Sequence, residues 1–214
     1  MDKIYIFSGL GADYRAFKNI NFGDLPIEHI KWISPFKDET IENYALRISD
    51  KITTENSILI GLSFGGMMLM EIAKIKKSKK IILIASAKTK NEIPQLYRIL
   101  GKLKLHKIIP NQILKTTNSL MFWLFGISKK EDKQLLKNII SDTDIVFLKW
   151  AINEIVNWKN TQIPNNAIHI HGTKDKIIPL TNATYDYEIQ NGGHLMTLNK
   201  SKEIEAILIK LCTL

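Results

Sequence analysis

The hydrophobic residues of this chain form short runs that alternate with segments of helical spacing. Runs of strand length lie at 3–7, 27–33, 58–62, 80–85, 167–171 and 184–189. Segments 40–52 and 200–211 carry apolar residues three or four positions apart, and segment 64–76 is apolar almost all round, as in a buried helix. The alternation predicts right-handed βαβ units and an α/β fold with a mainly parallel, six-stranded sheet.

A second pattern interrupts this alternation from about Asn91 to Asn160. The segment contains no convincing strand and fits three or four amphipathic helices better. We expect these helices around 93–105, 111–125, 130–140 and 142–158. The sequence thus predicts one three-layer α/β domain over residues 1–214, with an all-helical insert between its fourth and fifth strands.

Composition narrows the classes of protein to consider. The 214 residues are 45% hydrophobic and 24% charged, which is typical of one globular domain with a sizeable core. The net charge is +9, and the densest lysine group, at 74–80, ends a predicted helix, where cations are favourable. Without interleaved aromatic residues or a binding motif, this group predicts a solvated helix end and no nucleic-acid partner. The single cysteine, Cys212, cannot form a disulfide or a thiolate metal site within one chain.

Neither a leader nor a membrane span is expected. Only a short apolar run precedes Ser8, and the longest apolar run, at 120–125, is too short to cross a bilayer. We therefore expect a cytoplasmic protein with no membrane partner, and the sequence does not indicate an oligomeric state.

The segment Gly61-Leu62-Ser63-Phe64-Gly65 joins the third predicted strand to the helix behind it. Glycines two before and two after a serine permit a turn so tight that side chains there would collide with backbone. Such a turn presents the serine hydroxyl at a helix N-terminus, where a developing anion is stabilised. The frame predicts that Ser63 is a nucleophile, and the alternative is an ordinary strand-to-helix turn.

A serine nucleophile needs a base, and the chain has five histidines. His194 lies in a glycine-rich loop after the last predicted strand, where open α/β sheets place their sites. His29 and His169 lie within predicted strands and are more readily structural. His106 lies in the helical insert, and His171 ends the fifth predicted strand. We therefore predict that His194 is the base.

The base needs a carboxylate to orient it, and Asp175 follows the fifth predicted strand by four residues. We interpret His171 as part of the turn that presents this aspartate. The competing carboxylates Asp142, Asp144 and Asp186 follow no predicted parallel strand so closely. The alternative for Asp175 itself is an exposed turn residue.

The order Ser63, Asp175, His194 resembles the serine-type α/β-hydrolase fold family. The resemblance covers nearly the whole chain outside the insert, and the insert falls where that family commonly carries a helical cap. It implies an oxyanion hole made by the backbone N–H groups of Phe64 and Leu10. Family members often have His-Gly where this chain has Ser8-Gly9, and the family's first two antiparallel strands are missing. The chain resembles a minimal, carboxylesterase-like member.

The triad order and the resemblance predict a serine hydrolase, either a carboxylesterase or a thioesterase, that cleaves a small acyl ester through an acyl-enzyme on Ser63. A serine nucleophile argues against a dehalogenase or an epoxide hydrolase, and no metal or organic cofactor is implied. Two alternatives remain open. The same triad could transfer the acyl group to an alcohol or thiol, or the chain could be a non-catalytic receptor that keeps the pocket.

The insert is expected to cover Ser63 and to select the acyl group with apolar side chains. Five large apolar residues follow one another at 121–125, and consecutive residues of a helix face all directions. Some of them must face a surface other than one helix–sheet contact. We expect Trp123, Phe125 and, next to the base, Leu195 to contact substrate. The alternative is that the cluster packs within the cap or against a second copy.

Overall fold

A sheet of six strands lies at the centre of the protein, which a computed structural model describes over residues 2–104 and 108–213. The strands lie in the order β2-β1-β3-β4-β5-β6, and every neighbouring pair is parallel. They are β1 (Ile4–Phe7), β2 (Ile27–Ile30), β3 (Ile58–Leu62), β4 (Lys80–Ile84), β5 (Ala167–Gly172) and β6 (Tyr187–Ile189). The expected α/β class and the six-stranded sheet are confirmed.

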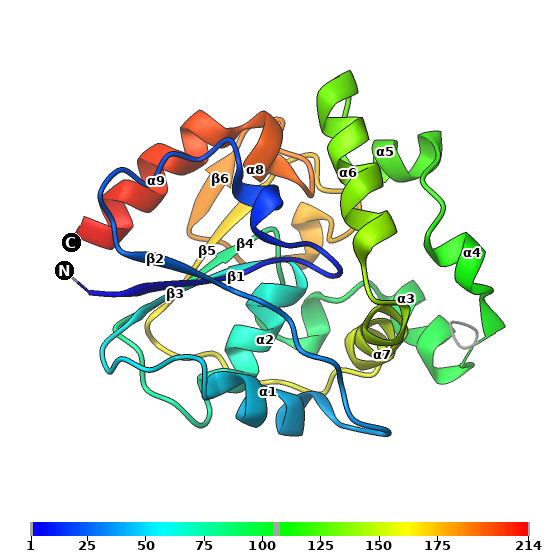
Figure 1. The fold of residues 1–214 in the computed structure, drawn as a ribbon, viewed down its shortest axis with the longest axis horizontal. Helices are drawn as coiled ribbons and strands as arrows, with labels where there is room; N and C mark the ends of the chain where they lie inside the picture. Colours follow the sequence, from blue (N-terminus) through cyan, green and yellow to red (C-terminus); the bar gives the residue numbers. More distant parts are fainter. Residues whose placement is uncertain (1, 105–107, 214) are drawn as a thin grey trace.

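Helices cover both faces of the sheet, as Figure 1 shows. One face packs against α1 (Ile41–Ser49) and α2 (Phe64–Ile72), and the other against η1 (Tyr14–Phe17), α8 (Met196–Asn199) and α9 (Ser201–Thr213). Successive strand residues point to opposite faces, so β1 sends Tyr5 and Phe7 to the first core and Ile4 and Ile6 to the second. Burial on both sides explains why the strands are continuous apolar runs.

The helical insert leaves the sheet after β4 and returns at β5, and Figure 1 shows it beyond the carboxyl ends of the strands. Its helices are α3 (Gln95–Lys102), α4 (Asn111–Leu114), α5 (Ser119–Phe125), α6 (Lys130–Asp142) and α7 (Ile145–Val156). Two short 3-10 helices, η2 (Lys90–Glu92) and η4 (Leu180–Asn182), lie at nearby loops. In the described part of the chain, no helix combines the length and apolar character that a membrane span needs.

One expected helix of the insert is wrong, because segment 111–125 forms two helices. The first ends at Leu114, and the second begins after Asn118. The Asn118 side chain accepts a hydrogen bond from the Met121 N–H at 2.9 Å, which makes it the N-cap of a new helix. Residues 105–107, which include His106 and the end of the expected helix 93–105, lie outside the described residues.

Hydrogen bonds attach the insert to the rest of the protein beyond the carboxyl ends of the strands. The Thr143 hydroxyl, between α6 and α7, donates to the Gly11 carbonyl at 2.7 Å. The Leu195 N–H donates to the Phe125 carbonyl at 3.1 Å. These contacts fix the insert over the loops that follow β1 and β6.

The topology brings the loops after β1 and β3 together. From β1 the chain adds β2 on one side, and then β3 and the remaining strands on the other. The strand order therefore reverses between β1 and β3, and open α/β sheets bind their ligands at the carboxyl ends of the strands at such a point. The loop containing Leu10 and the turn at Ser63 lie there.

Gly65 allows the first turn of α2 to cross the end of β1. A Cβ atom at this position would overlap the Phe7 carbonyl oxygen and lie 2.5 Å from the Ser8 carbonyl oxygen. Because both are backbone atoms, we predict that Gly65→Ala lowers the free energy of unfolding by about 1–3 kcal/mol, as overpacking does. Urea unfolding followed by circular dichroism measures this change.

Gly9→Ala is the matched control, because its Cβ would lie 3.5 Å from the Ser63 Cβ, an ordinary contact. We expect that variant to stay within about 0.5 kcal/mol of the native protein. Equal stability of the two variants would contradict the close approach of α2 to β1.

Candidate active site

Ser63 occupies a strained turn between β3 and α2. Its backbone angles are φ 51° and ψ −118°, a region that residues with a side chain rarely adopt, at a cost of about 1–3 kcal/mol. The surrounding chain holds the turn: the Ser63 N–H donates to the Ile84 carbonyl at 2.9 Å, and the Ser86 hydroxyl donates to the Ser63 carbonyl at 2.7 Å. The turn places the serine hydroxyl at the N-terminus of α2.

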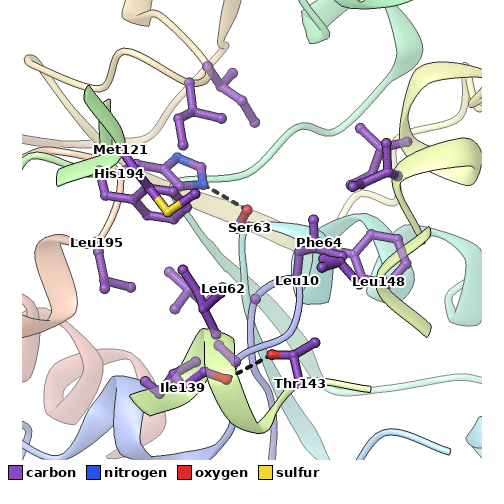
Figure 2. Close-up of a pocket in the computed structure, with 18 of the residues that line it drawn as sticks. Leu10, Leu62, Ser63, Phe64, Met121, Ile139, Thr143, Leu148, His194 and Leu195 are labelled. Carbon is purple, nitrogen blue, oxygen red and sulfur yellow. Dashed lines mark hydrogen bonds between the residues drawn. The ribbon is translucent and has the colours of Figure 1, made fainter. Parts of the chain in front are cut away.

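The structure brings Ser63, His194 and Asp175 into one chain of hydrogen bonds. Ser63 Oγ lies 2.8 Å from His194 Nε2, the contact that Figure 2 draws as a dashed line. His194 Nδ1 lies 2.8 Å from Asp175 Oδ2. With Nδ1 protonated, the neutral ring donates to the carboxylate and accepts the serine O–H. The three side chains come from the loops after β3, β5 and β6, as their sequence positions predicted.

The Asp175 carboxylate is buried and held on both oxygens. Oδ1 accepts hydrogen bonds from the N–H groups of Ile177 and Ile178, each at 2.9 Å, and Oδ2 faces His194. Burial acts to raise the pKa of Asp175, but the charge and hydrogen bond of His194 and the Ile178 N–H lower the pKa below its ordinary value. The group is therefore an ionised carboxylate that fixes the orientation of the imidazole.

The two histidines of β5, His169 and His171, lie close to backbone carbonyl oxygens near the triad. The His169 Nδ1–H donates to the Thr184 carbonyl at 2.8 Å, and His171 Nε2 lies 2.9 Å from the Ile178 carbonyl oxygen. Both side chains are fully buried, and burial lowers the pKa of each, that of His169 to about 3. His171 also lies 3.8 Å from Asp175, consistent with a part in the turn that presents it.

The competing carboxylates have other partners. Asp142 pairs with Arg15 at 2.8 Å, and Asp144 caps α7 by accepting the Val146 N–H. Asp186 accepts the backbone N–H of His169 at 2.8 Å. None of the three lines the cavity beside Ser63.

Leu10 and Phe64, the residues expected to form an oxyanion hole, lie near Ser63. Both residues line the same cavity as Ser63, and Figure 2 shows them next to it. Neither N–H donates a hydrogen bond to another residue in the described part of the chain. Two such donors, together with the N-terminus of α2, can bind an oxygen that becomes negative as Ser63 attacks a carbonyl.

A cavity of about 320 Å³ opens from Ser63 and His194 under the insert. No lysine, arginine, aspartate or glutamate lines it in the described part of the chain, and apolar side chains from the insert form about half of its lining. These include Ile93, Met121, Phe125, Leu136, Ile139, Ile140, Leu148, Ile152 and Ile155. The volume and the apolar lining are typical of a small-molecule site.

Of the three residues that the sequence predicts as substrate contacts, two line the cavity and one lies outside it. Phe125 and Leu195 line the cavity, and the Phe125 ring meets His194 edge-on at 5.7 Å between centroids. Trp123 does not line it: the side chain is 57% exposed, and Lys176 Nζ lies 4.0 Å from the centre of its ring. Two positions along a helix turn a side chain by about 200°, so Trp123 and Phe125 occupy opposite faces of α5.

Sequence reasoning missed most of the cavity wall. Met121 lies four residues before Phe125 on α5, a spacing that places both side chains on one helix face. That spacing was a usable signal. For Leu136 and Ile140 of α6, helical spacing shows that they share a face, but not that the face turns toward Ser63.

Comparison with solved structures assigns the fold. The chain is similar to MenH from S. aureus, with a TM-score of 0.72 and 17% identity over 98% of this chain and 92% of that one. It is also similar to a thermophilic esterase from Thermogutta terrifontis, with a TM-score of 0.70 and 13% identity over 99% and 89% of the two chains. No protein-family model and no curated protein sequence matches the chain. The protein therefore has the α/β-hydrolase fold, as the resemblance implied.

Because His169 is buried and neutral, we expect it to make the stability of the protein depend on pH. The unfolded chain binds a proton at this histidine near pH 6.5, but the folded protein only near pH 3. Between these values the unfolded state binds more protons, so stability falls as the pH falls. We predict that His169→Asn removes about 2 kcal/mol of the stability loss between pH 7 and pH 5, since one pKa unit is worth about 1.4 kcal/mol.

Urea unfolding at a series of pH values measures how the free energy of unfolding changes with pH in His169→Asn and in the native protein. The asparagine amide keeps a donor for the Thr184 carbonyl but does not titrate. Parallel pH profiles of the two proteins would show that His169 is not held neutral in the folded state.

Proposed function

We propose that the protein is a serine hydrolase that cleaves esters or thioesters of apolar acyl groups. One observation carries this proposal: the hydrogen-bonded chain of Ser63, His194 and Asp175 opens directly into an uncharged cavity. A binding protein needs the cavity but has no use for an activated hydroxyl. The complete triad therefore supports catalysis over a receptor role.

The geometry supports a two-step mechanism. His194 Nε2 accepts the Ser63 proton as Oγ attacks the acyl carbonyl, and Asp175 stabilises the charged imidazole. The N–H groups of Leu10 and Phe64 bind the oxyanion of the tetrahedral intermediate. His194 then donates its proton to the leaving alkoxide or thiolate, which leaves an acyl group on Ser63. Water attacks this ester as His194 accepts its proton, and His194 then returns that proton to Ser63 Oγ as the acyl C–O bond breaks and the acid departs.

The cavity lining supports an uncharged acyl group. A carboxylate buried among the side chains of the insert would lose its hydration without gaining an ionic partner, which costs several kcal/mol. Each methylene that leaves water contributes about 0.8 kcal/mol to binding. Selection by chain length is therefore the kind of specificity that this wall provides.

A series of p-nitrophenyl esters, from acetate to dodecanoate, tests the proposal. We predict that kcat/KM rises by up to about fourfold per methylene until the cavity is full. The hemisuccinate ester should react far more slowly than the butyrate, because its free carboxylate has no partner. Ser63→Ala and His194→Ala should each lose nearly all turnover. An active Ser63→Ala variant, or a preference for the charged ester, would contradict the proposed function.

Matched variants of the insert test which wall selects the chain. Ile140→Phe narrows the cavity and should move the optimum to shorter esters. Trp123→Phe is the control, because that side chain lies outside the cavity and should leave the optimum unchanged. If both variants prefer the same ester chain length, α6 does not contact the acyl group.

A further inference from the structure

The outer face of the insert is unusually apolar for a surface. Among the described residues, sixteen large hydrophobic side chains are exposed, and eight of them lie within the 28 residues from 96 to 123. On α3 and its C-cap residue, the side chains of Leu96, Ile99, Leu100 and Leu103 follow the i, i+3, i+4, i+7 spacing of one helix face, and these residues are 37–63% exposed. This spacing normally marks the buried side of a helix.

The face of α3 that packs against the rest of the insert is not this apolar stripe. A Cβ atom at Gly101 would lie 2.5 Å from Val156 Cγ2, so Gly101 marks the face that packs against α7. The apolar stripe of α3 is therefore largely exposed, and Ile108 (76% exposed) and Ile113 (61% exposed) follow it in the sequence. Leu100, Ile108 and Ile113 also border an apolar groove against α7. We call these six residues, Leu96, Ile99, Leu100, Leu103, Ile108 and Ile113, the outer cap face.

The charged residues of the segment that carries the outer cap face have one sign. The sequence has no aspartate or glutamate between Glu92 and Glu131. Lys102 and Lys104 flank Leu103 in sequence, and Lys115 follows α4. None of the three pairs with a carboxylate in the described part of the chain. An apolar helix face bordered by unpaired cations is the pattern of a helix that lies in a lipid interface.

We propose that the outer cap face docks on an anionic lipid surface. Its leucine and isoleucine side chains would enter the boundary between headgroups and acyl chains, and the lysines would pair with lipid phosphates. The charge argues against a second copy as occupant, because a two-fold contact would place this basic patch against itself. From the sequence we expect no membrane partner, because the longest apolar run is too short to cross a bilayer. That reasoning concerns segments that span a membrane and does not apply to binding at its surface.

The outer cap face also adjoins the catalytic cavity. An apolar groove between α3, α4 and α7 shares Tyr97, Ile113, Ile152 and Ile155 with the cavity beside Ser63. An acyl chain drawn from a lipid phase would thus stay in apolar surroundings on its way to the nucleophile. This last step rests on the proposed function, whereas docking itself does not.

Vesicle flotation tests docking without any measurement of activity. We expect the protein to float with phosphatidylcholine vesicles that contain phosphatidylglycerol, and not with phosphatidylcholine alone. Reversing Lys102 and Lys104 (K102E/K104E) should weaken binding by at least about 25-fold, at about fivefold per cation removed. Ile99→Asp with Leu103→Asp should abolish flotation. The matched control is Ile75→Asp with Lys77→Glu, in the turn that follows α2, and it should bind as the native protein does.

Circular dichroism confirms that each variant is folded, and hydrolysis of p-nitrophenyl acetate shows that the surface variants keep the active site. Ser63→Ala should float normally, so loss of catalysis and loss of docking are distinguishable. The proposal is overturned by equal binding to both kinds of vesicle, by no binding, or by equal loss in the control. It is also overturned if analytical ultracentrifugation finds a dimer that Ile99→Asp with Leu103→Asp dissociates, because the face is then a contact between copies.

Discussion

The candidate site depends on how closely α2 approaches the sheet at Ser63. A Cβ atom at Gly61 would lie 2.5 Å from the Gly66 nitrogen, so the strand and the helix meet backbone to backbone. Ser63 in this turn has φ 51°, and two hydrogen bonds offset the strain: its N–H donates to the Ile84 carbonyl of β4, and its carbonyl accepts the Ser86 hydroxyl. Without that turn the hydroxyl would leave the reach of His194, and the Phe64 N–H would leave the reach of an oxyanion.

The parallel sheet explains why residues so far apart in sequence meet. Every strand ends at the same edge, so the loops after β1, β3, β5 and β6 converge without any long excursion of the chain. The insert then covers this edge with apolar side chains. An uncharged wall strengthens the electrostatic interactions of the triad, and under the proposed function it would also select the acyl group.

The sequence was most informative where backbone geometry restricts the choice of residue. The glycine frame around Ser63 and the loops after predicted strands were enough to predict the positions of His194 and Asp175. It was least informative in the insert, where short apolar segments can turn either face inward. The Asn118 cap split one expected helix, and Lys176 holds Trp123 on the outside while Phe125 faces the cavity. Those outcomes depend on tertiary neighbours that helical spacing does not reveal.

The central claim is that Ser63 is an activated nucleophile, and covalent labelling tests it most directly. A fluorophosphonate reacts with a serine only when a base accepts its proton and the phosphoryl oxygen is stabilised. Peptide mass spectrometry after labelling should find one modified residue, Ser63, and labelling should be lost in Ser63→Ala and strongly slowed in His194→Ala. Modification of another residue, or no modification of a protein that still hydrolyses esters, would contradict the account.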